Sequence, residues 1–228
     1  MGNCTEVQSK QLKNFRSLSE TARQELLTTS ETIVIPKGQT IFKENQPLSK
    51  LYCIKKGACK FSKVDAVGQE HILRFLGEGE VMGKRSILTD NGAKVNAVAL
   101  TETELCCLDK KTVVRNLGEN AAFCQDFLDA LIQDVNINEH TRIIFYANKG
   151  IKQRLAQLLL YLKNKYGVDE NGKLLIRLKR EDMAAVLGTS AEYVINLIKR
   201  FKNLGWINTI KSEIFLVSEK DLLRIINN

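Results

Sequence analysis

Residues 180–199 read REDMAAVLGTSAEYVINLIK, which is the pattern of two short helices joined by a tight turn. Two helices that cross steeply need a small side chain at the crossing, here Ala184, and a turn residue that tolerates a positive φ, here Gly188. Ser190 is placed to cap the second helix. An ordinary amphipathic helix pair would not require alanine and glycine at these positions. The stretch therefore predicts a helix-turn-helix, with inward-facing apolar side chains at Met183, Leu187, Val194 and Leu197.

The flanking sequence predicts a small winged domain around these two helices. Residues 151–166 place leucines on one side of a helix, and residues 173–178 alternate like a strand. Residues 205–217 read as a β-hairpin, and a final helix begins near Ser218. A helix-turn-helix followed by a hairpin is a winged arrangement, which we predict for the C-terminal part of the chain.

The positive charge of the chain is concentrated in the same part. The net charge is +8, and residues 148–228 carry 15 lysines and arginines against 8 aspartates and glutamates, a local net charge of +7. A basic module is attracted to a polyanion, because neutralising phosphates releases condensed counterions. A basic face is also often merely solvated. Combined with the helix-turn-helix and the wing, however, the charge predicts binding to double-stranded DNA.

The second helix of the pair is expected to lie in the major groove, where side chains near its N-terminus reach base edges. Glu192 can accept a hydrogen bond from cytosine N4, and Asn196 can pair with adenine. Contacts to phosphates position a protein without reading sequence, and we expect them from hydroxyl and cationic side chains of both helices. The predicted DNA-binding residues are Lys179, Arg180, Thr189, Ser190, Ala191, Glu192, Tyr193, Asn196, Lys199 and Arg200.

Residues 31–109 have a different sequence pattern, which is typical of β-structure. Short runs rich in Val, Ile, Phe and Tyr are separated by turn residues, such as PKG at 36–38 and NG at 91–92. Short and evenly spaced strands of this kind indicate a β-sandwich or barrel. Strands are predicted over residues 32–35, 40–42, 50–55, 58–64, 70–76, 93–100 and 104–108.

A long helix is predicted over residues 119–147, which contain no glycine or proline. Such a helix is about 40 Å long at 1.5 Å per residue, so it exceeds the core of either neighbouring half. Its apolar stripe needs a partner, and a second copy of the same helix provides one. The alternative is that the helix packs only on its own β domain. The predicted dimer interface consists of Phe123, Phe127, Leu131 and Asn138, of which Asn138 would fix the register.

The sequence does not predict a metal site, a membrane span or a catalytic centre. No two of the six cysteines show the C-x-x-C spacing typical of metal sites, so free thiols are expected, with a redox-sensing thiol as the alternative. The longest apolar run, residues 158–162, is too short to cross a bilayer. The N-terminus has no apolar signal region, so a cytoplasmic location is expected. No nucleophile–base pair or phosphate loop supports an enzyme.

Taken together, these features resemble the CRP/FNR family of bacterial transcription regulators over nearly the whole chain. The resemblance rests on KGQTIF at 37–42, LYCIKKG at 51–57 and GEVMG at 79–83. The strongest evidence for the resemblance is the stretch from Ala184 to Gly205, which is similar to the family's A-x-x-x-G-x-S-x-E-x-V unit.

This resemblance implies an α+β architecture in three parts: a β-roll (jelly-roll-like) sensor domain over residues 1–118, a dimerisation helix over 119–147 and a winged helix-turn-helix over 148–228. It also implies a homodimer on a palindromic operator, with recognition helices about one DNA turn apart. The β-roll would sense a small signal, and this signal would change the arrangement of the long helices. RNA polymerase is a further candidate partner, and a membrane is not.

The chain departs from the family members that bind cyclic AMP. In those members a Glu one residue after the counterpart of Gly83 holds the ribose hydroxyl, and a later Arg-Ser or Arg-Thr holds the cyclic phosphate. Here Lys84 stands at the Glu position and Lys94 at the Arg position. A lysine cannot accept the ribose hydrogen bond and is a point charge instead of a bidentate fork, so cyclic AMP is disfavoured. The candidate effector pocket, which takes a different anion or is a solvated loop, comprises Gly83, Lys84, Arg85, Ser86, Lys94 and Val95.

Two further departures concern the cofactor and the operator. Iron–sulfur members carry an N-terminal cysteine cluster, and here only Cys4 stands in that region, so this cofactor is disfavoured and none is predicted. The family often has arginine where this chain has Ala191 and Asn196, so an operator that differs from the usual family sequence is expected.

We predict a dimeric, sequence-specific DNA-binding transcription regulator whose effector is unidentified. The alternative is a ligand-binding or interaction protein of the same fold that has lost sequence-specific DNA reading. Ala191 and Glu192 on the recognition face favour this alternative, and the local charge of +7 opposes it.

Overall fold

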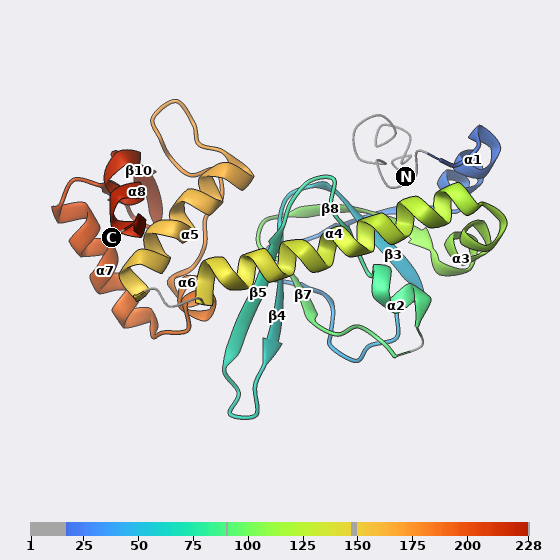
Figure 1. Cartoon of the computed structure of the whole chain (residues 1–228), viewed down its shortest axis with the longest axis horizontal. Coiled ribbons are helices and arrows are strands. Elements are labelled where there is room, and N and C mark those ends of the chain that lie inside the picture. The colour runs from blue at the N-terminus through green and yellow to red at the C-terminus, as the bar shows by residue number, and fades with distance from the viewer. Residues whose placement is uncertain (1–16, 90, 147–149, 228) are drawn as a thin grey trace. The chain divides into compact units, whose positions relative to one another are not determined.

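The computed structural model describes residues 17–89, 91–146 and 150–227, with the side chains of the long helix described as far as Asn136. The architecture is mixed α+β, with a β-sandwich, a long helix and a helix-turn-helix with a small hairpin, as the sequence predicts (Figure 1). Contacts divide the chain into two units. The first contains residues up to 63 and 74–138, and the second contains residues 64–73 and 139 onward.

Two four-stranded sheets form the centre of the first unit, although residues 64–73, which include parts of two of their strands, are assigned to the second unit. One sheet has the order β1 (Glu31–Ile35), β8 (Thr103–Asp109), β3 (Lys50–Lys56) and β6 (Val81–Met82). The other has the order β2 (Thr40–Phe42), β7 (Asn96–Ala99), β4 (Cys59–Val64) and β5 (Glu70–Leu76). Three short helices accompany the sheets, namely α1 (Glu20–Thr28), α2 (Lys84–Leu88) and α3 (Lys110–Glu119). The long helix α4 (Ala121–Tyr146) follows them.

The alternation of side chains along β8 divides the core of this unit into two layers. Leu105 and Cys107 pack in a cluster drawn from both sheets. Cys106 and Leu108 point to the opposite face, where a second cluster joins the first sheet to α1, α2, α3 and α4. This is the consequence of the two-residue period of a strand, which sends neighbouring side chains to opposite faces.

The elements missed by the sequence analysis are short or directly follow another element. The two-residue strand β6 and the five-residue helix α2 are too brief to show a period. Helix α3 directly follows β8, because the Asp109 carboxylate accepts a hydrogen bond from Thr112 N and caps the helix. The long helix then starts anew at Ala121, where the Asn120 side chain accepts a hydrogen bond from Phe123 N.

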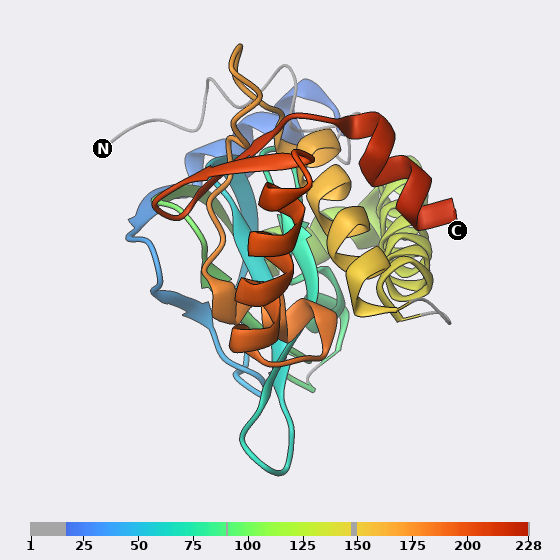
Figure 2. The same cartoon turned by 90° about the vertical axis from the view of Figure 1, so that its left-hand side faces the viewer.

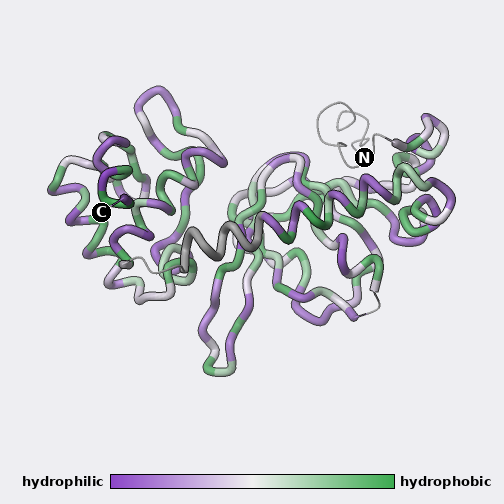
Figure 3. The backbone as a smooth tube through the Cα atoms, in the orientation of Figure 1, coloured by the Kyte–Doolittle hydropathy of each residue, from purple (hydrophilic) through white to green (hydrophobic). Residues whose placement is uncertain are grey.

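Helices and one hairpin make up most of the second unit, which also holds the end of α4. Its elements within the described residues are α5 (Ile151–Tyr166), α6 (Arg180–Leu187), α7 (Ala191–Asn203), β9 (Ile207–Ile210), β10 (Glu213–Leu216) and α8 (Glu219–Asn227). Leu155, Leu159 and Leu162 line the buried side of α5, as its leucine spacing predicts. Hydrophobic and hydrophilic residues are interleaved along the helices of both units (Figure 3). This amphipathic pattern is what allows one face of each helix to be buried.

The prediction of a strand over residues 173–178 is wrong. The chain makes only isolated bridges here, with Lys173 opposite Phe215 and Leu174 opposite Val168. Because these consecutive residues pair with different partners, no continuous ladder forms, and the backbone bends at Leu175 on its way to α6.

Candidate nucleic-acid interface and effector pocket

The turn between α6 and α7 has the geometry that its sequence predicts. Gly188 adopts a left-handed conformation with φ of +62°, and Thr189 N donates to Ala184 O at 3.2 Å. A Cβ added at Gly188 would meet no atom within 4 Å, so the backbone conformation, and not a lack of space, requires glycine here. Ser190 Oγ accepts a hydrogen bond from Tyr193 N at 3.2 Å and thereby caps α7.

Helix α7 leads from α6 to the hairpin (Figure 2). It has one buried and one exposed face. Its buried side chains are Val194, Leu197, Ile198 and Phe201. The predicted base-reading residues Glu192 and Asn196 lie on the exposed face together with Lys199, at spacings of four and three residues. Of the other residues predicted for this surface, Tyr193 is exposed and Ala191 is half-buried.

The cationic side chains predicted to contact phosphates differ in their exposure to solvent. Lys179, Lys199 and Arg200 are exposed and form no ion pair within the described part of the chain. Arg180 is half-buried, with Nη1 at 3.6 Å from Met183 Sδ. Burial lowers the pKa of Arg180. Among the hydroxyl residues of the turn, Ser190 is exposed and Thr189 is half-buried.

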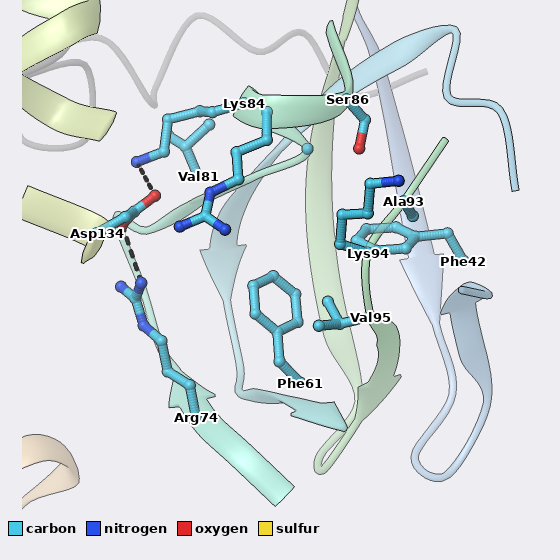
Figure 4. A pocket seen from close by; sticks show the side chains of 12 residues that line it. Phe42, Phe61, Arg74, Val81, Lys84, Ser86, Ala93, Lys94, Val95 and Asp134 are labelled. Carbon is cyan, nitrogen blue, oxygen red and sulfur yellow. Dashed lines mark hydrogen bonds and ion pairs between the residues drawn. The ribbon is translucent and has the colours of Figure 1, made fainter. Parts of the chain in front are cut away.

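A cavity of about 100 Å³ lies in the first unit, and all six residues of the predicted effector pocket line it. Figure 4 shows the side chains around it. Phe42 and Phe61 supply aromatic walls, and Arg74 and Asp134 border the cavity on another side. The structure therefore brings together Gly83, Lys84, Arg85, Ser86, Lys94 and Val95, which are separated by up to 12 positions in the sequence.

Lys84 belongs to a buried ion-pair network. Its Nζ lies 2.8 Å from Asp134 Oδ2, and Arg74 Nη1 lies 2.9 Å from Asp134 Oδ1 (Figure 4). The second terminal nitrogen of Arg74 pairs with Glu80. The side chains of Arg74 and Lys84 are only 5% and 8% exposed. Burial alone would lower the pKa of Arg74, but Glu80 and Asp134 outweigh it and raise the pKa above its usual value.

The remaining polar groups of the pocket differ from Lys84 in their surroundings. Ser86 Oγ donates to Gly92 O at 3.1 Å and is buried. Lys94 Nζ donates to Asn91 O at 3.0 Å and is exposed. Arg85 is exposed and forms no ion pair within the described residues. Two cations therefore remain accessible at the pocket, and Lys84 is neutralised by Asp134.

Three other features of the described residues bear on function. No helix there is long and apolar enough to cross a membrane, and no group of His, Cys, Asp and Glu there could hold a metal ion. The described cysteines form no disulfide, and Cys53, Cys59, Cys106 and Cys107 are buried. Cys4 lies outside the described residues.

Models of two protein domains match the chain on either side of the long helix. Residues 32–120 match the cyclic nucleotide-binding domain, and residues 153–225 match the Crp-like helix-turn-helix domain. The second match contains the α6–α7 turn and the hairpin. The chain belongs to the CRP/FNR family of transcription regulators. It is thus a DNA-binding transcription regulator of CRP/FNR type and not an enzyme.

Similar proteins extend over nearly the whole chain. The CRP-like cAMP-activated global transcriptional regulator of Mycobacterium tuberculosis is 25% identical over 92% of this chain and 93% of its own length. The global nitrogen regulator of Nostoc sp. is 29% identical over 91% of this chain and 93% of its own length. A solved CRP/FNR-family regulator from Thermus thermophilus superposes with a TM-score of 0.72 at 23% identity, covering 87% of this chain and 99% of that chain, and it supports the fold.

The structure revises the predicted dimer residues of this CRP/FNR protein. Phe123 and Phe127 are buried in the core of their own unit, and Leu131 packs against the same cluster. Asn138 lies in α4 beyond the described side chains. The apolar stripe that the sequence analysis assigned to a partner thus covers the protein's own sheet. Among the residues of α4 up to Asn136, whose side chains are described, the exposed large apolar ones are Leu128, Ile132 and Val135, at 45%, 57% and 40%.

Sequence reasoning missed Asp134, which pairs with Lys84, and Arg74, which pairs with the same carboxylate. Arg74 lies in a strand between apolar neighbours, and Asp134 lies in a helix with many charged residues, so neither position is conspicuous. The available signal was the lysine at position 84 itself, because a buried lysine needs a carboxylate nearby. That signal could not have indicated which of the 26 acidic residues of the chain supplies it.

Proposed function

We propose that this CRP/FNR regulator binds a palindromic operator as a homodimer, with one α7 in each of two successive major grooves. The exposed face of α7 supports this most directly, because Glu192 and Asn196 lie there beside cations that have no ion-pair partner in the described chain. The net charge of +7 in residues 148–228 adds attraction to phosphates. Glu192 and Asn196 read bases, and the exposed residues Lys179, Ser190, Lys199 and Arg200 contact the backbone.

The exposed stripe of α4 supports the dimer. Leu128, Ile132 and Val135 follow one another at spacings of four and three residues, which is the spacing of a coiled-coil seam. All three lie on a helix whose opposite face is already buried in its own unit. A second copy of α4 would cover this stripe and would remove its apolar surface from water.

The pocket geometry argues against cyclic AMP as the effector, although the Mycobacterium tuberculosis relative is named as cAMP-activated. Lys84 has no acceptor for a ribose hydroxyl, and its ammonium already pairs with Asp134. An anionic effector would instead approach Arg85 and Lys94 and would compete with Asp134 for Lys84. Such competition would change how α4 is held against the sheets, which is a route from the pocket to the helix.

Selection of DNA from a random pool tests the operator proposal. The full chain is expected to enrich a palindrome whose half-sites are about 10–11 base pairs apart, one helical turn. Recovery of no sequence above background would contradict the proposal and would favour a protein that has lost DNA reading.

The salt dependence of the same complex separates phosphate contacts from general charge. Lys199→Gln is expected to reduce the slope of log affinity against log salt by about 0.9 for each lost contact, because fewer counterions are released. Lys220→Gln, which removes the same charge from the exposed surface of α8, is the matched control and should leave the slope nearly unchanged. Equal slopes for the two variants would contradict a phosphate contact at Lys199.

A further inference from the structure

Ile195 is a large apolar side chain on the exposed side of α7, outside the buried face of that helix. It is 39% exposed, whereas the buried face of the helix is completed by Val194, Leu197 and Phe201 together with Ile198. A β-branched residue loses side-chain freedom in a helix, so isoleucine also favours α7 less than alanine would. Helix formation therefore does not explain an isoleucine at this position, and a substantial part of its apolar surface stays exposed outside the buried face.

The position of Ile195 places it among the residues that face DNA in the proposed function, on which this inference rests. It follows Glu192 by three residues, precedes Lys199 by four and is adjacent to Asn196. Residues three and four apart lie on the same side of a helix. Glu192, Ile195, Asn196 and Lys199 therefore form one exposed stripe that starts in the first turn of α7.

The chemistry of this stripe determines what Ile195 can recognise. An isoleucine side chain has no hydrogen-bond donor or acceptor, so it cannot read the polar groups of a base pair. The apolar feature that the major groove offers is the C5-methyl group of thymine. The only arginine of α7, Arg200, lies in its last turn, so the N-terminal half of the helix has no bidentate fork for guanine.

We propose that Ile195 is a specificity-determining residue that recognises thymine through its C5-methyl group. The stripe then combines an acceptor at Glu192, an amide at Asn196 and an apolar contact at Ile195. Each half-site should accordingly contain a thymine whose methyl group contributes to binding.

Removal of single methyl groups from the DNA tests this proposal directly. The operator obtained by selection is synthesised with each thymine of one half-site replaced in turn by deoxyuridine, which removes the methyl group and keeps the base pairing. Affinities of wild type, Ile195→Ala and Leu223→Ala are measured by fluorescence anisotropy at one salt concentration. Leu223→Ala is the control, because it removes an exposed aliphatic side chain from α8.

At one thymine, deoxyuridine is expected to weaken wild type and Leu223→Ala by about fourfold, the effect of leaving one methyl group unburied. The same replacement should change the affinity of Ile195→Ala by less than about 1.5-fold, because the contact is already lost. Unchanged circular dichroism and thermal unfolding would show that Ile195→Ala is folded.

The outcomes separate this inference from the proposed function. An operator that is bound but contains no thymine sensitive to deoxyuridine would overturn the inference alone. The same holds if wild type and Ile195→Ala lose equal affinity at every thymine. A wild-type protein that selects no operator would overturn the proposed function and this inference together.

Discussion

Glu192 lies in the first turn of α7, two residues after the cap formed by Ser190. Its carboxylate is exposed, so it keeps the acceptor capacity that reading a cytosine amino group requires. Lys199 lies on the same face but offers only a flexible point charge, which suits phosphate contacts. Neighbouring residues on one face are thus expected to differ in what they contribute to recognition.

Substitution of these two residues should separate base reading from phosphate binding. Glu192→Ala is expected to relax base choice at one operator position by about 1–3 kcal/mol, because one base-edge contact is lost. Lys199→Gln should weaken binding to all sequences about equally. Affinities for an operator set with each base varied in turn measure both effects. A uniform loss for Glu192→Ala would show that this residue does not read bases.

Cys59 shows how burial controls the chemistry of a side chain. It is fully buried in the cluster that joins the two sheets, and burial raises the pKa of its thiol to about 12. The thiolate is the reactive form, so Cys59 is protected from oxidation and alkylation near neutral pH. A redox-sensing role is therefore not favoured for this residue.

The raised pKa of Cys59 makes stability depend on pH. The thiol stays protonated in the folded protein, whereas in the unfolded chain it ionises near its ordinary pKa, so the stabilisation is complete below that value and decreases as pH rises toward 12. Between about pH 8 and 10 the wild type should lose about 1.5 kcal/mol more unfolding free energy than Cys59→Ala. Urea unfolding at both pH values measures this, and parallel losses would contradict it.

At the scale of elements, α4 has three surfaces with different surroundings. Phe123 and Phe127 pack on the first unit, Asp134 reaches the pocket, and the stripe that contains Ile132 is exposed. The sequence predicts an apolar stripe on this helix, covered either by a second copy or by the helix's own β domain. For Phe123 and Phe127 the second alternative is correct. The exposed stripe remains available for the proposed second copy.

Asp134 is expected to hold α4 against the sheets. Asp134→Asn would leave the buried cations Arg74 and Lys84 without their shared carboxylate, which should cost about 2–4 kcal/mol of unfolding free energy. Asp129→Asn, an exposed change on the same helix, is the matched control and should cost less than about 0.5 kcal/mol. Chemical denaturation of the full chain measures both, and equal costs would show that the network does not stabilise the helix.

At the scale of the whole molecule, the proposed activity requires two chains, because one α7 can read only one half-site. The dimer must form through a surface that the first unit leaves exposed, and the exposed stripe of α4 meets this condition. DNA affinity and oligomeric state should therefore be coupled.

Ile132→Asp is expected to produce monomers, because a carboxylate would be buried in the proposed seam. Val114→Asp changes an exposed apolar residue of α3 in the same way and should remain dimeric. Sedimentation velocity distinguishes the two. A dimer that persists in Ile132→Asp would place the interface elsewhere.

The ligand response is also a property of the whole molecule. Cyclic AMP is expected to leave operator affinity unchanged, because Lys84 and Lys94 replace the groups that hold it in related proteins. Fluorescence anisotropy with and without the nucleotide measures this. A clear increase in affinity would show that the pocket accepts cyclic AMP despite these residues.

The sequence by itself determined most of the local elements and their order, but not β6, α2 or α3. The helix-turn-helix depends on Ala184, Gly188 and Ser190, and the strands depend on short apolar runs between turns, so the determining residues lie next to one another in the chain. The six pocket residues around Lys84 and Lys94 were proposed from the resemblance to family members that bind cyclic AMP, and the structure places all six around one cavity.

Only the tertiary structure decided which face of α4 is covered and what neutralises Lys84. A helical period shows that an apolar face exists, but it does not show whether the chain's own sheet or another molecule covers it. Lys84 and Asp134 are 50 positions apart, and their ion pair exists because folding brings α2 and α4 to the same cavity. Contacts between distant segments depend on how elements pack, and a single sequence does not record that packing.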